Sequence, residues 1–550
     1  MPNSTTMTAP PRATRLPRAY PASRGLLIAN AVALLTVAVA LRAWQLGNIP
    51  GVNGDEAWSG VQAARLLAGE SVDWWTPHGN PLNLFLVLPL AALQAVTSPS
   101  FTLLRLPSLI SGLAALVANY FLCRRTFDGR TAVVSTIFLA LLPIDIAYSR
   151  FAWDASQSLL ATVFVLYLPI AHCRARGATS SLSGWAMLAL GAAIYIHPTN
   201  VFAAPLLVVP VALARRKQID EVLRSTQIPA RSWCFAAIAA ISLATAYLAW
   251  QAISRGFGHL HGPSDLPAFA INYLRLFSGT TIYEFIAGAN LAASDSTWFG
   301  LLPICCDLAF AVAAIFALVG MVRRLKQEPS ASDTALVWSW LAMLAGFFLI
   351  AGPAAIEPHS ERYGVCLVAP AALVFARGMS WWLDERHAYR RTAVIALAAV
   401  AWLWPVTFYL GYFEFIQQTG GQSHRTFRTA AVEPKLQAYE LMLAAHDASK
   451  PTTIVCQDWW CYWPIAYLAT GDANVRVLTW QAWQDRVATG ENSWRDPAWF
   501  VEFAGTIEER ELTRQLESAE RPVVVQTIRD YAGRPLLSLF APAENSSQNY

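Results

Sequence analysis

Long apolar segments recur along most of this chain, and they constrain its fold more than any other feature. Runs of about 17–22 residues begin near residue 25, carry almost no charge and are bounded by Arg, Pro or polar clusters. A helix of about 20 residues, rising 1.5 Å per residue, crosses the roughly 30 Å hydrocarbon core of a bilayer. Because only 14% of the residues are charged, against about 25% in soluble domains, we predict an integral membrane protein.

Eleven of these segments are predicted to cross the membrane, which gives an all-α polytopic bundle. They cover residues 25–44, 101–122, 131–148, 156–172, 181–196, 199–214, 232–252, 298–321, 334–352, 363–379 and 392–412. Residues 81–96 are also apolar enough to cross, but a crossing there would reverse the side of every later loop. We therefore expect the 81–97 region to form a helix that lies in or dips into the outer leaflet.

Clusters of basic residues orient the predicted bundle. Five of them fall on the same side as the Arg-rich N-terminal tail, at residues 124–130, 174–176, 215–217, 323–326 and 386–391. Loops rich in Lys and Arg remain in the cytoplasm. The sequence thus predicts a multi-pass protein of a bacterial cytoplasmic (inner) membrane, with its N-terminus inside and its C-terminus outside.

Three regions follow from this topology. Residues 1–24 form a disordered cytoplasmic tail, residues 25–412 form the membrane domain with long outer loops at 45–100 and 253–297, and residues 413–550 form a small extracytoplasmic α/β domain. In the last region, residues 453–456, 475–479, 523–526 and 536–540 are typical of strands, and 508–518 of an amphipathic helix. Cys456 and Cys461 are its only cysteine pair, and an oxidising compartment would permit a disulfide between them.

Two adjacent carboxylates, Asp55 and Glu56, follow the first span and precede a predicted amphipathic helix at 57–68. A carboxylate at the outer membrane surface can take a proton from an acceptor hydroxyl, or hold a divalent cation. Acids in the first turn of a helix also cap its free N–H groups and favour its dipole. The residues alone leave these readings open.

Three further polar clusters lie on the predicted outer face. They comprise Tyr148, Arg150 and Asp154 in one short loop, His197 at the end of a span, and Glu357, His359, Glu361 and Arg362 before another span. Arginine offers a fixed fork of donors to phosphate oxygens, so these clusters are candidates for binding a phosphate and a sugar. The alternatives are an interfacial anchor with a local ion pair, a structural histidine and a solvated loop.

The order of these features resembles the polyprenyl-phosphate-sugar-dependent glycosyltransferases of the GT-C fold, families 39 and 83. The closest branches are the protein O-mannosyltransferase-like enzymes and the lipid A aminoarabinose transferases. The resemblance covers about residues 25–380, and its motifs are Gly-Asp-Glu-Ala at 54–57, Arg-Leu-Pro-Ser at 105–108, Tyr-Ser-Arg at 148–150 with Asp154, and Glu-Arg-Tyr at 361–363. Residues 79–83, Gly-Asn-Pro-Leu-Asn, lack the Lys that often precedes the paired prolines of the aminoarabinose branch, which argues against a lipid A specificity.

The resemblance implies that Asp55 is the catalytic base and that Glu56 shapes the site beside it. From their charge and predicted side, Arg150, His359 and Arg362 are then expected to face the donor phosphate, and Asp154 is a candidate for contact with the sugar. The predicted reaction is transfer of a sugar, with inversion, from a polyprenyl phosphate to a hydroxyl of a glycan, lipid or protein. The only cofactor considered is a divalent metal ion at Asp55.

Other functions are set against this prediction. No glycine-rich phosphate-binding motif follows a strand, which disfavours nucleotide-sugar chemistry and an ATP-driven pump, and nothing indicates a nucleic-acid partner. A lipid-linked sugar transporter or flippase would need charges within the spans, which are scarce. A non-catalytic glycan-binding protein would use the tryptophans of the C-terminal domain, namely Trp459, Trp460, Trp463, Trp480 and Trp483.

Overall fold

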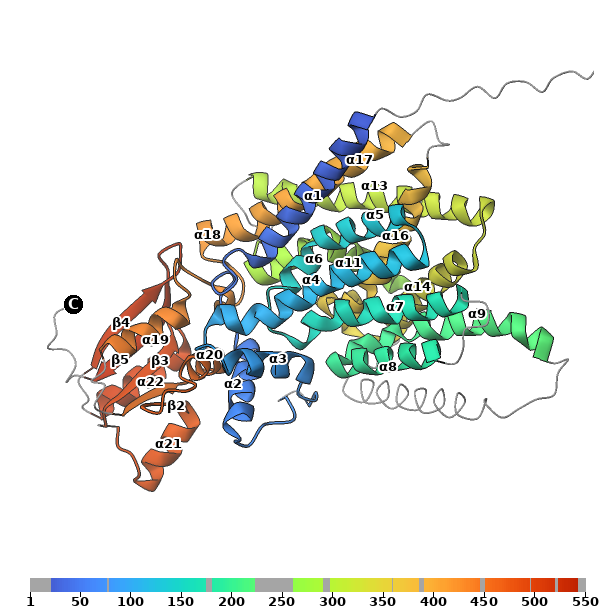
Figure 1. Ribbon diagram of the computed structural model, residues 1–550. Helices are drawn as coiled ribbons and strands as arrows, with labels where there is room; N and C mark the ends of the chain where they lie inside the picture. The colour runs from blue at the N-terminus through green and yellow to red at the C-terminus, as the bar shows by residue number, and fades with distance from the viewer. Residues whose placement is uncertain are drawn as a thin grey trace, which may run out of the picture.

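An elongated helical bundle and a small α/β domain at one of its ends make up the computed structural model (Figure 1). The structure describes residues 21–76, 79–174, 181–222, 261–289, 297–358, 360–384, 390–445, 451–494, 496–519 and 523–542. Residues 1–20 of the predicted tail, the predicted span at 232–252 and His359 lie outside the described residues. The end of the predicted tail, residues 21–24, is not disordered but forms the first turn of a helix.

The bundle is built from helices of very different length. The longer ones are α1 (Pro21–Ala43), α4 (Phe101–Thr126), α5 (Gly129–Leu141), α7 (Ser158–Arg174), α8 (Ser181–Ile196), α9 (Pro205–Val222), α11 (Leu266–Ser278), α13 (Thr297–Gln327), α14 (Ala331–Ile350), α16 (Val368–Trp382) and α17 (Arg390–Phe408). Short turns join them: α6 (Pro143–Tyr148), η1 (Asp154–Gln157), η2 (Pro198–Ala203), η4 (Pro263–Asp265), α12 (Thr280–Ile282), η5 (Tyr283–Ala287), α15 (Pro353–Ile356), η6 (Glu361–Leu367), η7 (Tyr409–Glu414), α18 (Phe415–Thr419) and η8 (Arg425–Phe427).

Five helical segments among the described residues are long and apolar enough to cross a membrane. They are Phe101–Thr126, Asp154–Ala171, Ile304–Gln327, Ala331–Ile350 and Tyr363–Trp382. Shorter apolar helices cover several other predicted spans, including Ile28–Ala43 and Gly184–Ile196. The predicted span at 131–148 is divided, because Leu142 is extended (ψ 124°) and Pro143 starts the separate helix α6. The helical membrane bundle is therefore supported, whereas the count of eleven spans is not confirmed.

The segment predicted to lie along the outer leaflet forms α3 (Leu84–Gln94), a helix of 11 residues. At 1.5 Å per residue it extends about 16 Å, roughly half of the hydrocarbon core. It packs against α2 (Gly54–Ala68) and the start of α4. Its length supports a helix that does not cross.

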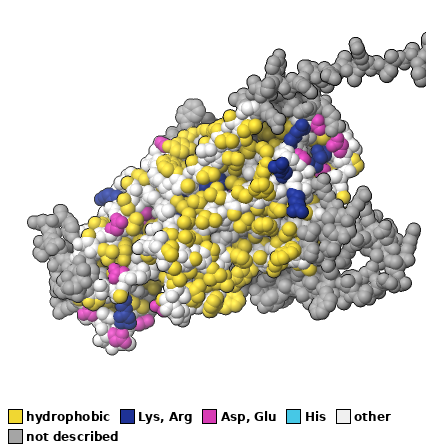
Figure 2. All heavy atoms as spheres, in the orientation of Figure 1, with side chains coloured by type: hydrophobic (Ala, Val, Ile, Leu, Met, Phe, Trp, Pro, Cys, Tyr) yellow, Lys and Arg dark blue, Asp and Glu magenta, His cyan; other side chains and the backbone are white. Residues whose placement is uncertain are grey.

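A broad apolar surface covers the side of the bundle between its two charged ends (Figure 2). Helix α13 contributes a row of exposed side chains three or four residues apart, namely Ile304, Leu308, Val312, Ile315, Val319 and Val322. An exposed apolar surface this extensive fits contact with lipid chains rather than with water.

The two predicted basic loops that the structure describes in full, at residues 124–130 and 323–326, lie at the end of the bundle away from the α/β domain (Figure 1). Arg377 of α16 forms ion pairs with Asp333 (Nε–Oδ1, 2.6 Å) and Asp128 (Nη1–Oδ2, 2.6 Å). Arg324 of α13 also contacts Asp333, at 3.0 Å. Because Asp128 caps α5 and Asp333 lies in the first turn of α14, this network fastens four helices together.

The C-terminal domain contains a five-stranded sheet in the order β2-β1-β3-β5-β4. Strands β2, β1 and β3 are parallel, and β5 is antiparallel to both β3 and β4. Its elements are α19 (Pro434–Ala444), β1 (Thr452–Cys456), α20 (Trp459–Leu468), β2 (Val475–Thr479), α21 (Trp480–Thr489), β3 (Ala498–Phe503), α22 (Ile507–Ser518), β4 (Val523–Arg529) and β5 (Pro535–Pro542).

The sequence predicted four of these strands and α22, but it missed β3. That strand is buried at all six positions, so it lacks the alternation of buried and exposed residues that marks a half-buried strand. The disulfide that an oxidising compartment would permit is not formed: Cys456 on β1 and Cys461 on α20 are separate, fully buried thiols.

The C-terminal domain and the first outer loop share one hydrophobic core. Ala57 and Val61 of α2 and Leu104 of α4 belong to the same cluster of buried residues as Ile454 of β1 and Val501 of β3. Helix α20 lies between the sheet and α2 (Figure 1). The segment that carries Asp55 and Glu56 is therefore fixed between the domain and the bundle.

Candidate active site at the first outer loop

A buried arginine from α4 holds the irregular segment that joins α1 to α2. Arg105 is fully buried and donates to the carbonyl oxygens of Leu46 (3.0 Å), Pro50 (2.9 Å) and Gly51 (3.3 Å). Carbonyl groups outside regular structure need such donors when they are buried. The path of the loop is thereby set just before the acidic pair.

Arg150 holds the same segment from another side. It is fully buried and donates to four carbonyl oxygens, those of Leu41 (2.8 Å), Arg42 (3.0 Å), Gln45 (3.4 Å) and Ile49 (2.6 Å). Its guanidinium also lies 4.7 Å from the centre of the Phe413 ring. Both terminal nitrogens thus point into the protein, so the predicted contact with a donor phosphate is not favoured.

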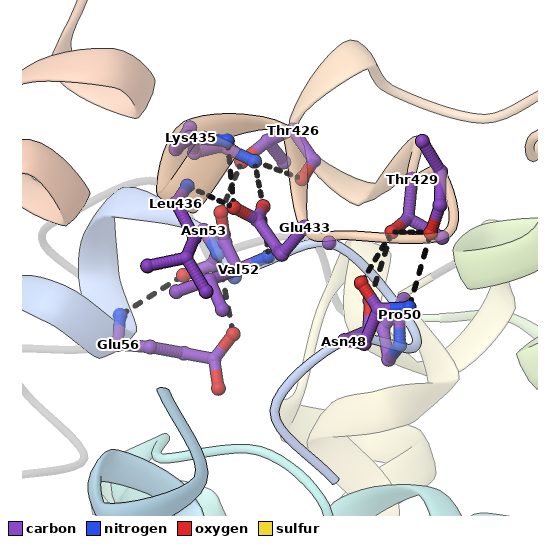
Figure 3. A network of polar contacts seen from close by, with 12 residues as sticks. Asn48, Pro50, Val52, Asn53, Glu56, Thr426, Thr429, Glu433, Lys435 and Leu436 are labelled. Atoms are coloured by element: carbon purple, nitrogen blue, oxygen red, sulfur yellow. Dashed lines mark hydrogen bonds and ion pairs between the residues drawn. The ribbon is translucent and has the colours of Figure 1, made fainter. Parts of the chain in front are cut away.

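The loop is also held by the segment that leads into the C-terminal domain (Figure 3). The Val52 amide donates to Glu433 (3.1 Å), and the Thr426 hydroxyl donates to the Val52 carbonyl (3.2 Å). Lys435 is buried and donates to both Glu433 (2.6 Å) and the Thr426 carbonyl (3.1 Å). The Thr429 hydroxyl donates to the Asn48 carbonyl (3.0 Å).

The two adjacent carboxylates have different surroundings. Glu56 is fully buried and accepts from Arg105 at Oε1 (2.7 Å) and Oε2 (2.8 Å). It also accepts from the amides of Asn53 (3.2 Å) and Ala152 (2.9 Å). Together with the Asn53 side chain, which accepts from the Glu56 amide (2.9 Å), it completes a capping box at the start of α2. The capping alternative therefore describes Glu56.

Asp55 is partly exposed at the N-terminus of the same helix. Its Oδ1 accepts a hydrogen bond of 3.1 Å from the indole Nε1 of Trp459, the first residue of α20. A side chain at Gly54 would place its Cβ 2.6 Å from the Trp459 ring, so the glycine permits this close approach. The positive end of the α2 dipole favours an ionised carboxylate at this position.

Two basic residues at the start of η8, His424 and Arg425, lie beside α20. The His424 ring lies 5.3 Å from the Trp460 ring, and its Nδ1 accepts from the Thr426 amide (3.3 Å). Burial lowers the pKa of His424; Asp458 acts against this effect, and Arg425 adds to it. Sequence reasoning missed His424 and Arg425, although both are basic residues that follow the last predicted span by about a dozen positions.

The other predicted site residues of the loop after α6 do not lie together at an open surface. Tyr148 is buried. Asp154 is partly exposed at the start of η1, where its Oδ1 accepts from the Ala155 amide at 2.8 Å.

The remaining predicted residues lie near η2 and η6. His197 caps η2, its Nδ1 lies 2.7 Å from the Thr199 hydroxyl, and its ring stacks on Tyr363 at 6.2 Å. This geometry matches the alternative of a structural histidine. Glu357 is exposed at the end of α15. His359 and the side chains of Glu361 and Arg362 lie outside the described residues.

Contacts between distant segments place the predicted outer loops at one end of the bundle. The Tyr195 hydroxyl donates to the Leu82 carbonyl (2.5 Å), and Asn83 donates to Gln157 (2.6 Å). With the stacking of His197 on Tyr363, these contacts connect the first outer loop to η1, η2 and η6. The Arg377 network lies near the opposite ends of these helices, so it is separated from the described outer loops.

No group of three His, Cys, Asp or Glu side chains that could hold a metal ion occurs within the described part of the chain. A divalent ion at Asp55 stays a prediction.

A known family of glycosyltransferases matches part of this chain. The model of the dolichyl-phosphate-mannose-protein mannosyltransferase family matches residues 84–251. This match confirms the predicted resemblance to glycosyltransferases that use lipid-linked sugars. No curated protein matches the chain.

Several solved structures share weak overall similarity with the chain. ArnT from Cupriavidus metallidurans in the apo state has 14% identity and a TM-score of 0.48, with 94% of this chain and 98% of that chain covered. The same protein bound to undecaprenyl phosphate has 13% identity and a TM-score of 0.47 over the same shares. Archaeal oligosaccharyltransferase AglB from Archaeoglobus fulgidus, in complex with an inhibitory peptide and a dolichol-phosphate, has 13% identity and a TM-score of 0.47, with 95% and 75% covered.

Proposed function

We propose that this protein transfers a sugar from a polyprenyl phosphate to a hydroxyl acceptor, with Asp55 as the general base. The supporting observation is the difference between the two adjacent carboxylates. Glu56 is buried and accepts from Arg105 and two backbone amides, whereas Asp55 is partly exposed on a rigid helix start. A base has to reach the proton that it removes, and of the two only Asp55 can do so.

The proposed step is a direct displacement at the anomeric carbon of the sugar. Asp55 takes the proton of the acceptor hydroxyl while the acceptor oxygen forms a bond to that carbon. The bond between the carbon and the phosphate oxygen breaks, and its electron pair leaves with the polyprenyl phosphate. Attack from the face opposite to the leaving group inverts the anomeric configuration.

The leaving phosphate gains negative charge, which donors and cations must stabilise. In place of Arg150, which is occupied with backbone carbonyls, we assign this role to Arg425 as a cation and to His424 as a hydrogen-bond donor through Nε2. Both interact electrostatically with Asp458, the residue before Trp459. Arg362 and His359 remain candidates for the same role.

The match to the dolichyl-phosphate-mannose-protein mannosyltransferase family supports a lipid phosphate as the carrier. Polyprenyl-phosphate mannose is therefore the donor to test first. The acceptor is a glycan, a lipid or a protein on the outer face of the cytoplasmic membrane, with the N-terminus of the enzyme inside and its C-terminus outside.

The experiment compares single-carboxylate variants of the full-length protein, purified in detergent and supplied with radiolabelled polyprenyl-phosphate mannose and a cell-envelope fraction. Asp55→Asn should retain the thermal unfolding midpoint and lose transfer by at least about 100-fold, the effect expected of a general base. Asp485→Asn, at an exposed carboxylate of α21, is the matched control and should transfer normally. Near-normal turnover by folded Asp55→Asn would remove Asp55 as the base.

A further inference from the structure

The order in which the chain adds strands to the C-terminal sheet reverses between the parallel strands β1 and β3. The chain passes from β1 to β2 on one side of β1, and then returns to β3 on the other side. In open sheets of this kind, ligands bind beyond the carboxyl ends of the strands at such a switch point. In this domain the switch point lies between the ends of β1 and β3.

Two buried oxygen atoms at this edge lack a hydrogen-bond partner among the described residues. Cys456 pairs with Val501 in the ladder, so Gln457 and Glu502 are the next neighbours beyond it. Glu502 is 1% exposed; its Oε1 accepts from the Phe503 amide (2.8 Å), whereas Oε2 has no partner. Oε1 of Gln457 is also buried and has no partner. Unsatisfied buried polar atoms are rare and call for a specific explanation.

The chemistry of the edge selects the ligand. Burial raises the pKa of Glu502 to about 8, and the nearby Asp458, Glu508 and Glu509 act in the same direction. At neutral pH its carboxyl group is therefore protonated and can both donate and accept a hydrogen bond. These three acids disfavour an anion directly beside Glu502. A neutral hydroxyl group, which also donates and accepts, suits Glu502 and Gln457 together.

The same edge leads to Asp55. Asp458 caps α20 by accepting from the Trp460 amide, and the residue between them, Trp459, donates to Asp55. The Trp460 side chain is partly exposed, and an aromatic face is a suitable surface for the apolar side of a sugar ring. Bound hydroxyl groups would thus lie along the path from the sheet edge to the proposed base.

We propose that Gln457, Asp458, Trp460 and Glu502 form an acceptor subsite that binds a sugar portion of the acceptor. This inference rests on the proposed function, and it narrows the acceptor to a glycan or a glycan-bearing molecule. Hydrogen bonds from the sheet edge would hold the sugar next to the hydroxyl group that Asp55 deprotonates.

The test separates binding of the acceptor from chemistry on the donor. Full-length protein receives radiolabelled polyprenyl-phosphate mannose either alone, where water replaces the acceptor and free mannose is released, or with the cell-envelope fraction. Glu502→Ala and Gln457→Ala should raise the KM for the envelope acceptor about tenfold, the order expected from one lost hydrogen bond. Release of free mannose should stay within about twofold of the wild type, because neither residue contacts the donor.

Controls separate the outcomes. Glu517→Gln removes an exposed carboxylate from α22 and should change neither readout. If Glu502→Ala unfolds, Glu502→Leu removes the hydrogen-bonding atoms while it fills more of the buried space. Unchanged acceptor KM in folded Glu502 and Gln457 variants would overturn the subsite, as would a labelled product whose acceptor part contains no sugar. Loss of the proposed function has a different signature: wild-type protein would neither release nor transfer mannose.

Discussion

Buried arginines occupy both ends of the bundle, but they bind different partners. At the end with the basic loops, Arg377 contacts the carboxylates of Asp333 and Asp128, which belong to the starts of two helices. At the other end, Arg105 and Arg150 donate mainly to backbone carbonyls of the segment between α1 and α2. Carboxylates are also met there, because Arg105 contacts Glu56 and Arg42 pairs with Asp145.

The buried arginines at the two ends therefore have different roles: Arg377 joins helices, whereas Arg105 and Arg150 position a loop. Ion pairs between helix termini join regular elements that already satisfy their own backbone. A non-helical segment at the membrane surface has no such internal bonds, so side chains must supply them. The end that bears Asp55 thus uses its arginines to fix the position of one carboxylate, as a preorganised site requires.

The largest effect is expected from Arg105→Leu. It leaves Glu56 buried without its counter-charge, which costs about 3–5 kcal/mol of unfolding free energy. It also releases three loop carbonyls, so the protein that remains folded should transfer poorly. Denaturant unfolding and transfer per folded molecule measure the two effects. Replacing Glu56 by Leu as well should recover stability without recovering transfer; recovery of both would show that the loop needs no fixed geometry.

Arg377→Leu tests the opposite end. The unfolding free energy should fall by about 3 kcal/mol or less, the lower end of the range for a broken buried ion pair. The reason is that Arg324 still contacts Asp333 and that the Asp128 side chain is 42% exposed. Turnover per folded molecule should be unchanged, since the network only fastens helices. A kcat loss as large as that of Arg105→Leu would mean that the two ends are not functionally distinct.

Glu502 provides a third case, a buried carboxylate without an arginine. Burial, with Asp458, Glu508 and Glu509, raises its pKa from 4.5 to about 8; Cys456 and Cys461 also face it. Between these pH values the folded protein keeps a proton that the unfolded chain has lost. Because of Glu502, the unfolding free energy should therefore fall by about 1.4 kcal/mol per pH unit as the pH rises from about 4.5 to about 8.

Glu502→Gln should remove this slope, and unfolding midpoints from pH 5 to pH 9 measure it. Glu517→Gln, on the surface of the same domain, should leave the slope intact. An equal slope in wild-type protein and Glu502→Gln would show that Glu502 is charged in the folded state.

Part of this arrangement could be predicted from the sequence. Apolar runs located the helices, and the alternation of basic loops with acidic loops placed Asp55 and Glu56 away from Arg377, because desolvation of charge forces both patterns. The Asn53-x-x-Glu56 spacing is also a capping-box signature that distinguishes Glu56 from Asp55. What no spacing shows is the direction of a side chain. Arg150 therefore seemed available to a phosphate, although it points inward.

The contact between the C-terminal domain and α2 could not be predicted either. It depends on packing between residues about 400 positions apart, such as Asp55 and Trp459, and no local pattern reports such packing. To predict this contact from sequence, one would need pairs of positions that vary together among related sequences. The spacing of apolar residues within one segment is not enough.

The smallest effect is expected at the hydrogen bond from Trp459 to Asp55. This bond adds to the arginine contacts that hold the loop before Asp55. Trp459→Phe removes one hydrogen bond, worth about 1 kcal/mol, so kcat should fall about fivefold with little change in stability. Trp463→Phe is the matched control, because its indole nitrogen is buried without a partner among the described residues. If Trp459→Phe slows transfer equally in the wild-type and Asp55→Asn backgrounds, the indole acts on something other than Asp55; if the effect disappears in Asp55→Asn, the hydrogen bond positions the base.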